Sequence, residues 1–155
     1  MSFLPNVTNI TQYQKGQIVV SGNGIGEDKA FCILNKNSTE TFAFGDALRV
    51  VGISGTQRIV DKATSTTDEI FGFIDFSNTS YSLKKGFSIS VLKSCEAFAM
   101  EASEAIAVGY LVEYVPTGSK VAVKDTGKVL GKAITAAAAD GDLLLVQLRP
   151  QINNN

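Results

Sequence analysis

Short runs in which apolar and polar residues alternate fill most of the chain from residue 17 to residue 148. The clearest is the segment 87–92, which reads Phe-Ser-Ile-Ser-Val-Leu. Strict alternation of this kind predicts a strand with one buried face. Further strands are predicted at 17–21, 30–34, 47–53, 58–60, 69–76, 110–115, 120–123, 129–134 and 143–148. Many short strands with glycines between them predict an all-β fold, a small sandwich or barrel of the β-clip or jelly-roll kind.

Only two segments, 97–108 and 133–139, have the alanine-rich composition of helices. Both are short, and isolated helices below about 12–15 residues are marginally stable. We therefore expect at most one or two short helices, each of a turn or two.

One order of glycines and strands occurs twice along the chain, over 44–92 and over 108–148. In each copy a glycine precedes an apolar strand, a second glycine makes a turn, a third lies inside a strand and a fourth leads into the last strand. Gly72 and Gly131 are the two that lie inside strands, where glycine marks a bulge or a close backbone approach. The pattern predicts a duplicated strand motif, and it fits two lobes as well as one merged barrel.

The two ends of the chain differ from its middle. Residues 1–16 are rich in Asn, Thr and Gln with scattered apolar side chains, which predicts an extended N-terminal arm. Residues 17–150 form the predicted β domain, and residues 151–155 a frayed tail. An arm of this length can reach a neighbouring subunit and add a strand to an exposed sheet edge. Its candidate anchors are Phe3, Leu4, Val7, Ile10 and Tyr13.

Composition narrows the classes of function. Apolar residues make up 45% and charged residues 19% of the 155 residues, which is a globular composition. The net charge of −1 gives no field that attracts nucleic acid or an anionic membrane, so neither is an expected partner. No apolar run approaches the roughly 20 residues of a membrane helix, and the first ten residues do not suggest a signal peptide.

The chemistry of catalysis is poorly represented. The chain has no histidine, which removes the commonest general base and metal ligand, so we expect no enzyme, no metal and no cofactor. The segment 22–26, Gly-Asn-Gly-Ile-Gly, lacks the spacing of a nucleotide-binding loop. Cys32 and Cys95 are expected to be buried thiols, with a single disulfide as the alternative.

A resemblance to a known family rests on three stretches. They are Phe44-Gly45-Asp46-Ala47-Leu48, the segment 102–115, and the ending 129–146 with its small-residue run and Gly-Asp before an apolar strand. With these, the segment 44–150 resembles the structural cement proteins that decorate the heads of tailed bacteriophages. The resemblance implies a β-rich fold, an oligomer (often a homotrimer), and binding to the major capsid protein on the outer capsid surface of the virion after synthesis in the host cytoplasm. It implies no catalytic residues.

Two other interpretations are open. The first is a receptor- or carbohydrate-binding module of a phage fibre or surface, which would use exposed aromatic side chains; Tyr13, Tyr81, Tyr110 and Tyr114 are the candidates. The second is a small enzyme that uses carboxylates alone, for which Asp140 and Asp142 are the residues to test.

Overall fold

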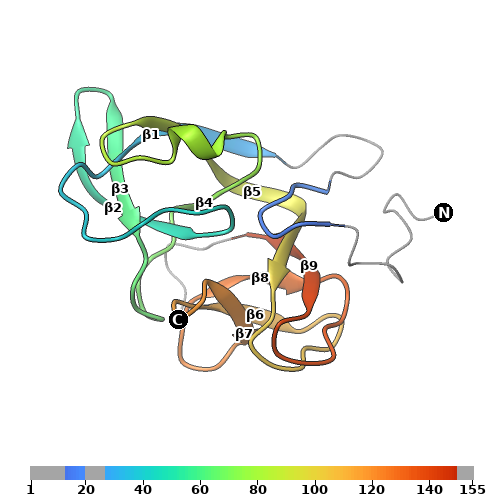
Figure 1. Cartoon of the computed structure of the whole chain (residues 1–155). Coiled ribbons are helices and arrows are strands. Elements are labelled where there is room, and N and C mark those ends of the chain that lie inside the picture. The colour runs from blue at the N-terminus through green and yellow to red at the C-terminus, as the bar shows by residue number, and fades with distance from the viewer. Residues whose placement is uncertain (1–12, 20–26, 150–155) are drawn as a thin grey trace.

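The computed structural model describes residues 13–19 and 27–149, and in this part of the chain the fold is all-β, as predicted. Nine strands lie in one continuous sheet of order β1-β3-β2-β4-β5-β9-β8-β6-β7 (Figure 1). The strands are β1 (Asp28–Leu34), β2 (Ala47–Ser54), β3 (Gln57–Lys62), β4 (Gly72–Ile74), β5 (Ser88–Glu101), β6 (Leu111–Val115), β7 (Lys120–Val123), β8 (Val129–Ala133) and β9 (Leu143–Leu148). A single 3-10 turn, η2 (Ser80–Ser82), is the one helical element among the described residues, and no described helix could span a membrane.

The first lobe is a small closed barrel. Strand β1 pairs with β3 in parallel, β3 with β2, β2 with β4, and β4 with the first half of β5. The ring closes because β1 also pairs with β5, from Asp28 opposite Ser94 to Ile33 opposite Ser88. This lobe occupies the upper part of Figure 1.

The second lobe is built in the same order from the second half of β5 onward. Strand β6 pairs with β7 and β8, β8 with β9, and β9 with β5. A parallel bridge between Ala102, just past β5, and Val121 in β7 brings the ends of this sheet together. In the second lobe β5 therefore holds the position that β1 holds in the first, and one strand of 14 residues belongs to both lobes.

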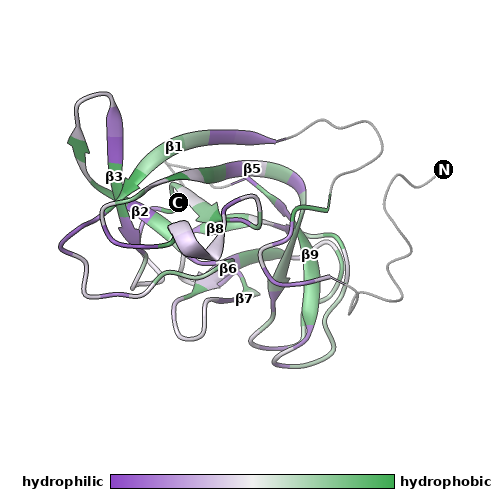
Figure 2. Ribbon diagram, turned by 45° about the horizontal axis from the view of Figure 1, so that its top comes forward, coloured by the Kyte–Doolittle hydropathy of each residue, from purple (hydrophilic) through white to green (hydrophobic). Residues whose placement is uncertain are grey.

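Three clusters of buried side chains hold the two lobes together. One fills the first barrel and includes Cys32, Leu34 and Val60. The largest fills the second lobe and extends between the lobes; its residues from the first lobe include Ala47, Phe73 and Leu92. Strand β9 is hydrophobic over most of its length (Figure 2), because alternate residues face this large cluster and a third cluster on the opposite side of the strand.

The third cluster lies beneath the segment 13–19. Gly16 N–H donates to the Ala99 carbonyl at 2.9 Å, and Val19 N–H donates to the Ala97 carbonyl at 2.9 Å. Residues 13–16, which the sequence assigned to the arm, thus run alongside β5. The predicted arm residues 1–12, the turn 20–26 and the tail 151–155 lie outside the described residues.

The two expected helices are wrong. Residues 97–101 continue β5, because Ala97 and Ala99 face the segment 13–19 whereas Phe98 and Met100 face the large cluster. Burial on both faces of a strand outweighs the helix propensity of alanine and glutamate. The segment 133–139 is held as a loop, where Ala137 forms an antiparallel bridge with Ile106.

The two glycines inside strands mark close backbone approaches at corresponding positions of the lobes. A Cβ added to Gly72 in β4 would lie 2.5 Å from the Leu92 carbonyl oxygen of β5. A Cβ added to Gly131 in β8 would overlap the Gln147 carbonyl oxygen of β9. Only a residue without a side chain fits at these points.

Candidate functional site

The contact between the lobes is organised around a buried carboxylate, Asp46, which lies directly before β2. The Ser119 hydroxyl, from the turn between β6 and β7, donates to Asp46 Oδ1 at 2.5 Å. Tyr114 in β6 donates its hydroxyl to Ser119 Oγ at 2.9 Å. Lys62 in β3 places its ammonium 3.3 Å from Asp46 Oδ2. Burial raises the pKa of Tyr114 above its ordinary value, so this phenol stays a donor at neutral pH.

These groups are satisfied by one another, so the network is suited to holding the lobes in register and not to chemistry. A second contact joins the same lobes: Gly127 N–H donates to the Glu113 carboxylate, and Lys128 N–H donates to the Thr66 carbonyl at 3.3 Å. Neither contact has a signature in the sequence, because its members lie far apart along the chain and only the duplicated fold brings them together.

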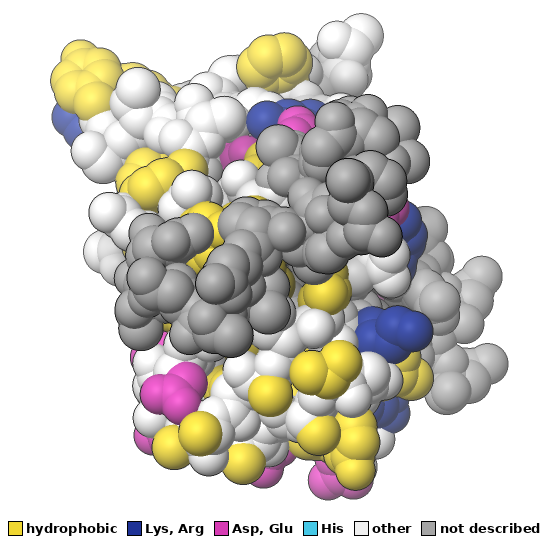
Figure 3. Space-filling view, turned by 90° about the vertical axis from the view of Figure 1, so that its right-hand side faces the viewer, with side chains coloured by type: hydrophobic (Ala, Val, Ile, Leu, Met, Phe, Trp, Pro, Cys, Tyr) yellow, Lys and Arg dark blue, Asp and Glu magenta, His cyan; other side chains and the backbone are white. Residues whose placement is uncertain are grey.

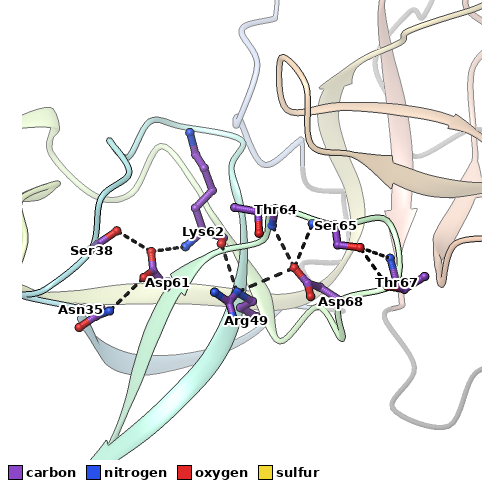
Figure 4. A network of polar contacts seen from close by, with 9 residues as sticks. All are labelled: Asn35, Ser38, Arg49, Asp61, Lys62, Thr64, Ser65, Thr67 and Asp68. Atoms are coloured by element: carbon purple, nitrogen blue, oxygen red, sulfur yellow. Dashed lines mark hydrogen bonds and ion pairs between the residues drawn. The ribbon is translucent and has the colours of Figure 1, made fainter.

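A second polar network lies in the first lobe (Figure 4). The Asp61 carboxylate accepts hydrogen bonds from the Ser38 hydroxyl at 2.6 Å, the Asn35 amide at 3.0 Å and the Lys62 backbone N–H at 2.8 Å. Burial alone would raise the pKa of Asp61, but these hydrogen bonds outweigh it and lower the pKa below its ordinary value. The network ties β3 to the turn that follows β1.

In the same region Asp68 holds the loop that leads to β4. Its Oδ2 accepts from the backbone N–H groups of Thr64 at 2.9 Å and Ser65 at 3.0 Å, and it lies 3.8 Å from Arg49 Nε. An open cleft of about 400 Å³ lies beside this loop and is lined by Arg49, Val50, Arg58, Asp68, Glu69, Ile70 and Phe71. Two arginines face two carboxylates there, so the cleft favours no ligand of one charge.

The other candidate carboxylates have structural partners. Asp142 accepts from the N–H groups of Ala138 and Ala139, at 3.0 and 3.1 Å, and so caps the turn before β9. Asp140 lies 2.7 Å from Lys120 Nζ. No cluster of His, Cys, Asp or Glu within 13–19 and 27–149 has the arrangement of a metal site. The two cysteines are free and buried, which confirms the expected thiols, and burial raises the pKa of Cys95 to about 12.

The predicted arm anchors fall in two groups. Phe3, Leu4, Val7 and Ile10 lie outside the described residues, and their role stays a prediction. Tyr13 is only 8% exposed and packs in the third cluster with residues of β5 and β9. A contact between the Tyr13 ring and another protein would require this segment to leave β5.

The four tyrosines proposed for carbohydrate binding do not form one platform. Tyr13 and Tyr114 are buried, whereas Tyr81 and Tyr110 are exposed. Tyr81 lies in η2 of the first lobe, and Tyr110 precedes β6 of the second. Lys84 Nζ also lies over the Tyr81 ring, 4.7 Å from its centroid, where a sugar would stack.

Exposed apolar side chains form one continuous surface on the second lobe, which the sequence did not single out. Two loops are joined there: Ala133 N–H donates to the Tyr110 carbonyl at 2.9 Å, and Ile106 bridges Ala137. This second-lobe apolar surface consists of Ala105, Ala107, Val108, Tyr110, Leu111, Ala136 and Ala138, all of them exposed. Figure 3 shows hydrophobic side chains gathered over the second lobe, in the lower part of one face.

The comparisons with known proteins extend these observations. No protein-family model matches the sequence, and no curated protein matches it. A solved structure is similar in fold: the N base of the head fiber gp8.5 in bacteriophage phi29. The similarity has a TM-score of 0.52 at 14% sequence identity, and it covers 79% of this chain and 94% of that chain. At this identity the comparison concerns the fold, and it spans both lobes.

Proposed function

We propose that this protein is a structural component of a tailed-phage head, a decoration protein that binds the outer surface of the major capsid protein shell and stabilises it. The observation that carries the proposal is the similarity in fold to nearly the whole N base of the phi29 head fiber. A protein whose name places it at the base of a head fiber offers a precedent for this double-barrel fold on a phage head.

The chemistry of the described residues supports a binding role. The buried carboxylates are hydrogen-bonded, the cleft beside Asp68 has balanced charges, and the chain has no histidine. The second-lobe apolar surface and the isolated exposed aromatic side chains are the unusual features of the surface, and contiguous exposed apolar patches mark interaction sites. The proposal therefore assigns binding and no catalysis.

Stabilisation of a shell follows from repetition. Each copy that bridges neighbouring capsid subunits adds binding free energy across a seam, and this gain must exceed the entropy lost on docking. A homotrimer with three modest sites gains avidity, because the second and third contacts form at high effective concentration. We include the homotrimer in the proposal, and light scattering after gel filtration measures it directly.

Co-sedimentation tests the proposed function. The purified protein is mixed with shells assembled from the major capsid protein of the same phage, without other head proteins. We expect saturable binding, density on the outer surface in cryo-electron microscopy, and a rise in the temperature at which the shells disassemble. Absence of binding at micromolar concentrations of both components contradicts the proposal.

The arm prediction is tested separately. Because Tyr13 packs against β5, a deletion that ends at residue 12 leaves the described fold whole. If the arm supplies anchors, this deletion weakens shell binding without a change in melting temperature. Unchanged affinity contradicts the arm hypothesis and leaves the decoration proposal in place.

A further inference from the structure

One end of the first lobe combines exposed lysines with exposed aromatic rings. We call it the basic end, and define it as Lys36, Tyr81, Lys84, Lys85 and Phe87, all of them exposed. It forms where β1 ends and β5 begins, around the turn that follows η2. In Figure 1 η2 lies on the side of the first lobe away from the second lobe.

Backbone contacts hold the basic end together. Gly86 N–H donates to the Leu34 carbonyl at 2.7 Å, and Leu34 N–H donates to the Phe87 carbonyl at 2.8 Å. Lys36 lies opposite Gly86, close enough for its Cβ to lie 3.6 Å from a Cβ added there. The three lysines therefore come from two segments that the barrel fixes side by side.

The aromatic rings of this end contact each other. Tyr81 and Phe87 meet edge to face, with ring centroids 6.4 Å apart. Lys84 Nζ lies over the Tyr81 ring at 4.7 Å from its centroid. Tyr81 is nevertheless 71% exposed, so a large apolar area stays open to a partner.

The charge of the basic end is uncompensated within the described residues. Lys36, Lys84 and Lys85 make no ion pair there, whereas Lys29, Lys62, Lys93 and Lys120 each lie within 4.0 Å of a carboxylate. A hollow of about 430 Å³ beside the lysines is lined by Glu40, Thr41, Phe42, Leu83, Lys84 and Lys85. Glu40 is the single acidic residue of this lining.

We propose that the basic end docks against an acidic protein surface, and that on a phage head this surface belongs to the shell; the inference rests on the proposed function. The lysines steer the encounter, because opposite charges across an interface accelerate association and fix its orientation. Tyr81 and Phe87 then bury their exposed faces as anchors, the role that aromatic residues hold in protein interfaces. The second lobe points away from the shell in this arrangement.

The same features argue against nucleic acid as the partner. Proteins that bind DNA through its backbone distribute many lysines and arginines along a face, and this chain carries a net charge of −1. Three lysines around two aromatic rings and an apolar hollow with Phe42 and Leu83 suit a compact, partly apolar contact.

Charge reversal tests the docking face. The test variant is Lys84→Glu with Lys85→Glu, and the matched control is Lys124→Glu with Lys132→Glu on the second lobe. Both are measured for binding to shells of the major capsid protein at 50 and 300 mM NaCl, with melting temperatures recorded for each. We expect the test variant to lose at least about tenfold in affinity at 50 mM NaCl and the control to stay within about twofold. The wild type loses affinity with salt, and the test variant loses less.

A second variant addresses the rings. Tyr81→Ala removes an exposed side chain, so the fold is retained, and we expect a loss of about tenfold in shell affinity that salt does not alter. If wild type binds shells and the lysine and Tyr81 variants bind equally well, the docking face is wrong and the decoration function stands. If wild type binds no shells, both proposals fail. Binding of wild type to a 30-base-pair DNA duplex as tightly as to shells overturns the choice of a protein partner.

Discussion

The two lobes repeat one order of strands but differ in how independent their cores are. The first barrel closes through a continuous ladder between β1 and β5, and every residue of its buried cluster lies in the first lobe. The second lobe closes through the single bridge of Ala102 with Val121, and its cluster includes Ala47, Phe73 and Leu92 of the first lobe. A repeated topology therefore need not produce two independent folding units, because the second lobe completes its core with side chains of the first.

The largest expected effect is at the centre of the shared core. Phe98 in β5 is fully buried and packs on Phe73 of the first lobe, with ring centroids 5.7 Å apart. Phe98→Ala leaves a cavity between the lobes and should lower the free energy of unfolding by about 3–5 kcal/mol. Urea unfolding followed by circular dichroism measures the loss, and we expect a single transition because both lobes border this cluster.

Phe31→Ala is the matched control for this experiment. Phe31 is 69% exposed on β1, so its removal should change stability by no more than about 0.5 kcal/mol. Two separate unfolding transitions in the Phe98 variant, one for each lobe, would contradict the shared core.

The next effect tests whether the glycines at corresponding strand positions are equivalent. Gly72→Ala and Gly131→Ala each force a Cβ against a neighbouring backbone carbonyl, and each should destabilise the protein by about 1–3 kcal/mol or more. Gly52→Ala in β2 is the control, because its Cβ would meet nothing nearer than Ile59 Cδ1 at 3.6 Å. A large loss at only one of the two positions shows that the lobes tolerate strand separation differently.

A smaller effect concerns the polar contact between the lobes. Tyr114→Phe removes the hydroxyl that donates to Ser119 and keeps the buried ring, so stability should fall by about 1 kcal/mol. Tyr110→Phe, at an exposed tyrosine of the same lobe, should leave the urea midpoint unchanged. If the two variants unfold alike, the hydroxyl does not contribute to joining the lobes.

The dependence on pH should originate in the first lobe. The folded-state pKa of Asp61 lies below its ordinary value near 3.8, so its contribution to stability is complete above that value and is lost as the pH falls through the folded-state pKa. Urea midpoints measured from pH 7 down to pH 2.5 should fall less steeply in Asp61→Asn than in the wild type. Parallel curves for the two proteins would assign the acid sensitivity to other groups.

The smallest effect is kinetic and compares the two cores through their own thiols. Cys32 lies in the first barrel and Cys95 in the large cluster, and each must be exposed by an opening of the structure before it reacts. In the single-cysteine variants Cys32→Ala and Cys95→Ala we expect the Cys95 thiol to react faster with a disulfide reagent, because the second lobe closes through one bridge. Equal rates would mean that the lobes open together.

Much of the fold is legible in the sequence, and the rest is not for identifiable reasons. Alternation predicted the start of β5 at residues 87–92, and the glycine order predicted two equivalent sets of strands. The continuation of β5 to Glu101 was missed, because its alanines are buried by the segment 13–19, a contact between residues some 80 positions apart. Helix propensity describes a local preference, and such a long-range contact overrides it.

The candidate surfaces were predicted less well than the strands. Tyr13 was placed on an exposed arm because its neighbours in sequence are polar, whereas the structure buries its ring against β5 and β9. The basic end joins Lys36 to residues 84 and 85 through the pairing of β1 with the turn before β5. No local pattern signals that juxtaposition, since it depends on which strands become neighbours.

The continuity of β5 has a mechanical consequence. Its 14 residues span about 45 Å, and each half is paired with strands of a different lobe. A force that pulls the lobes apart along this strand acts as tension on a covalent chain, and its hydrogen bonds must break in shear, many at once. A decorated shell that swells as DNA enters would then stretch a single strand before it could separate two domains.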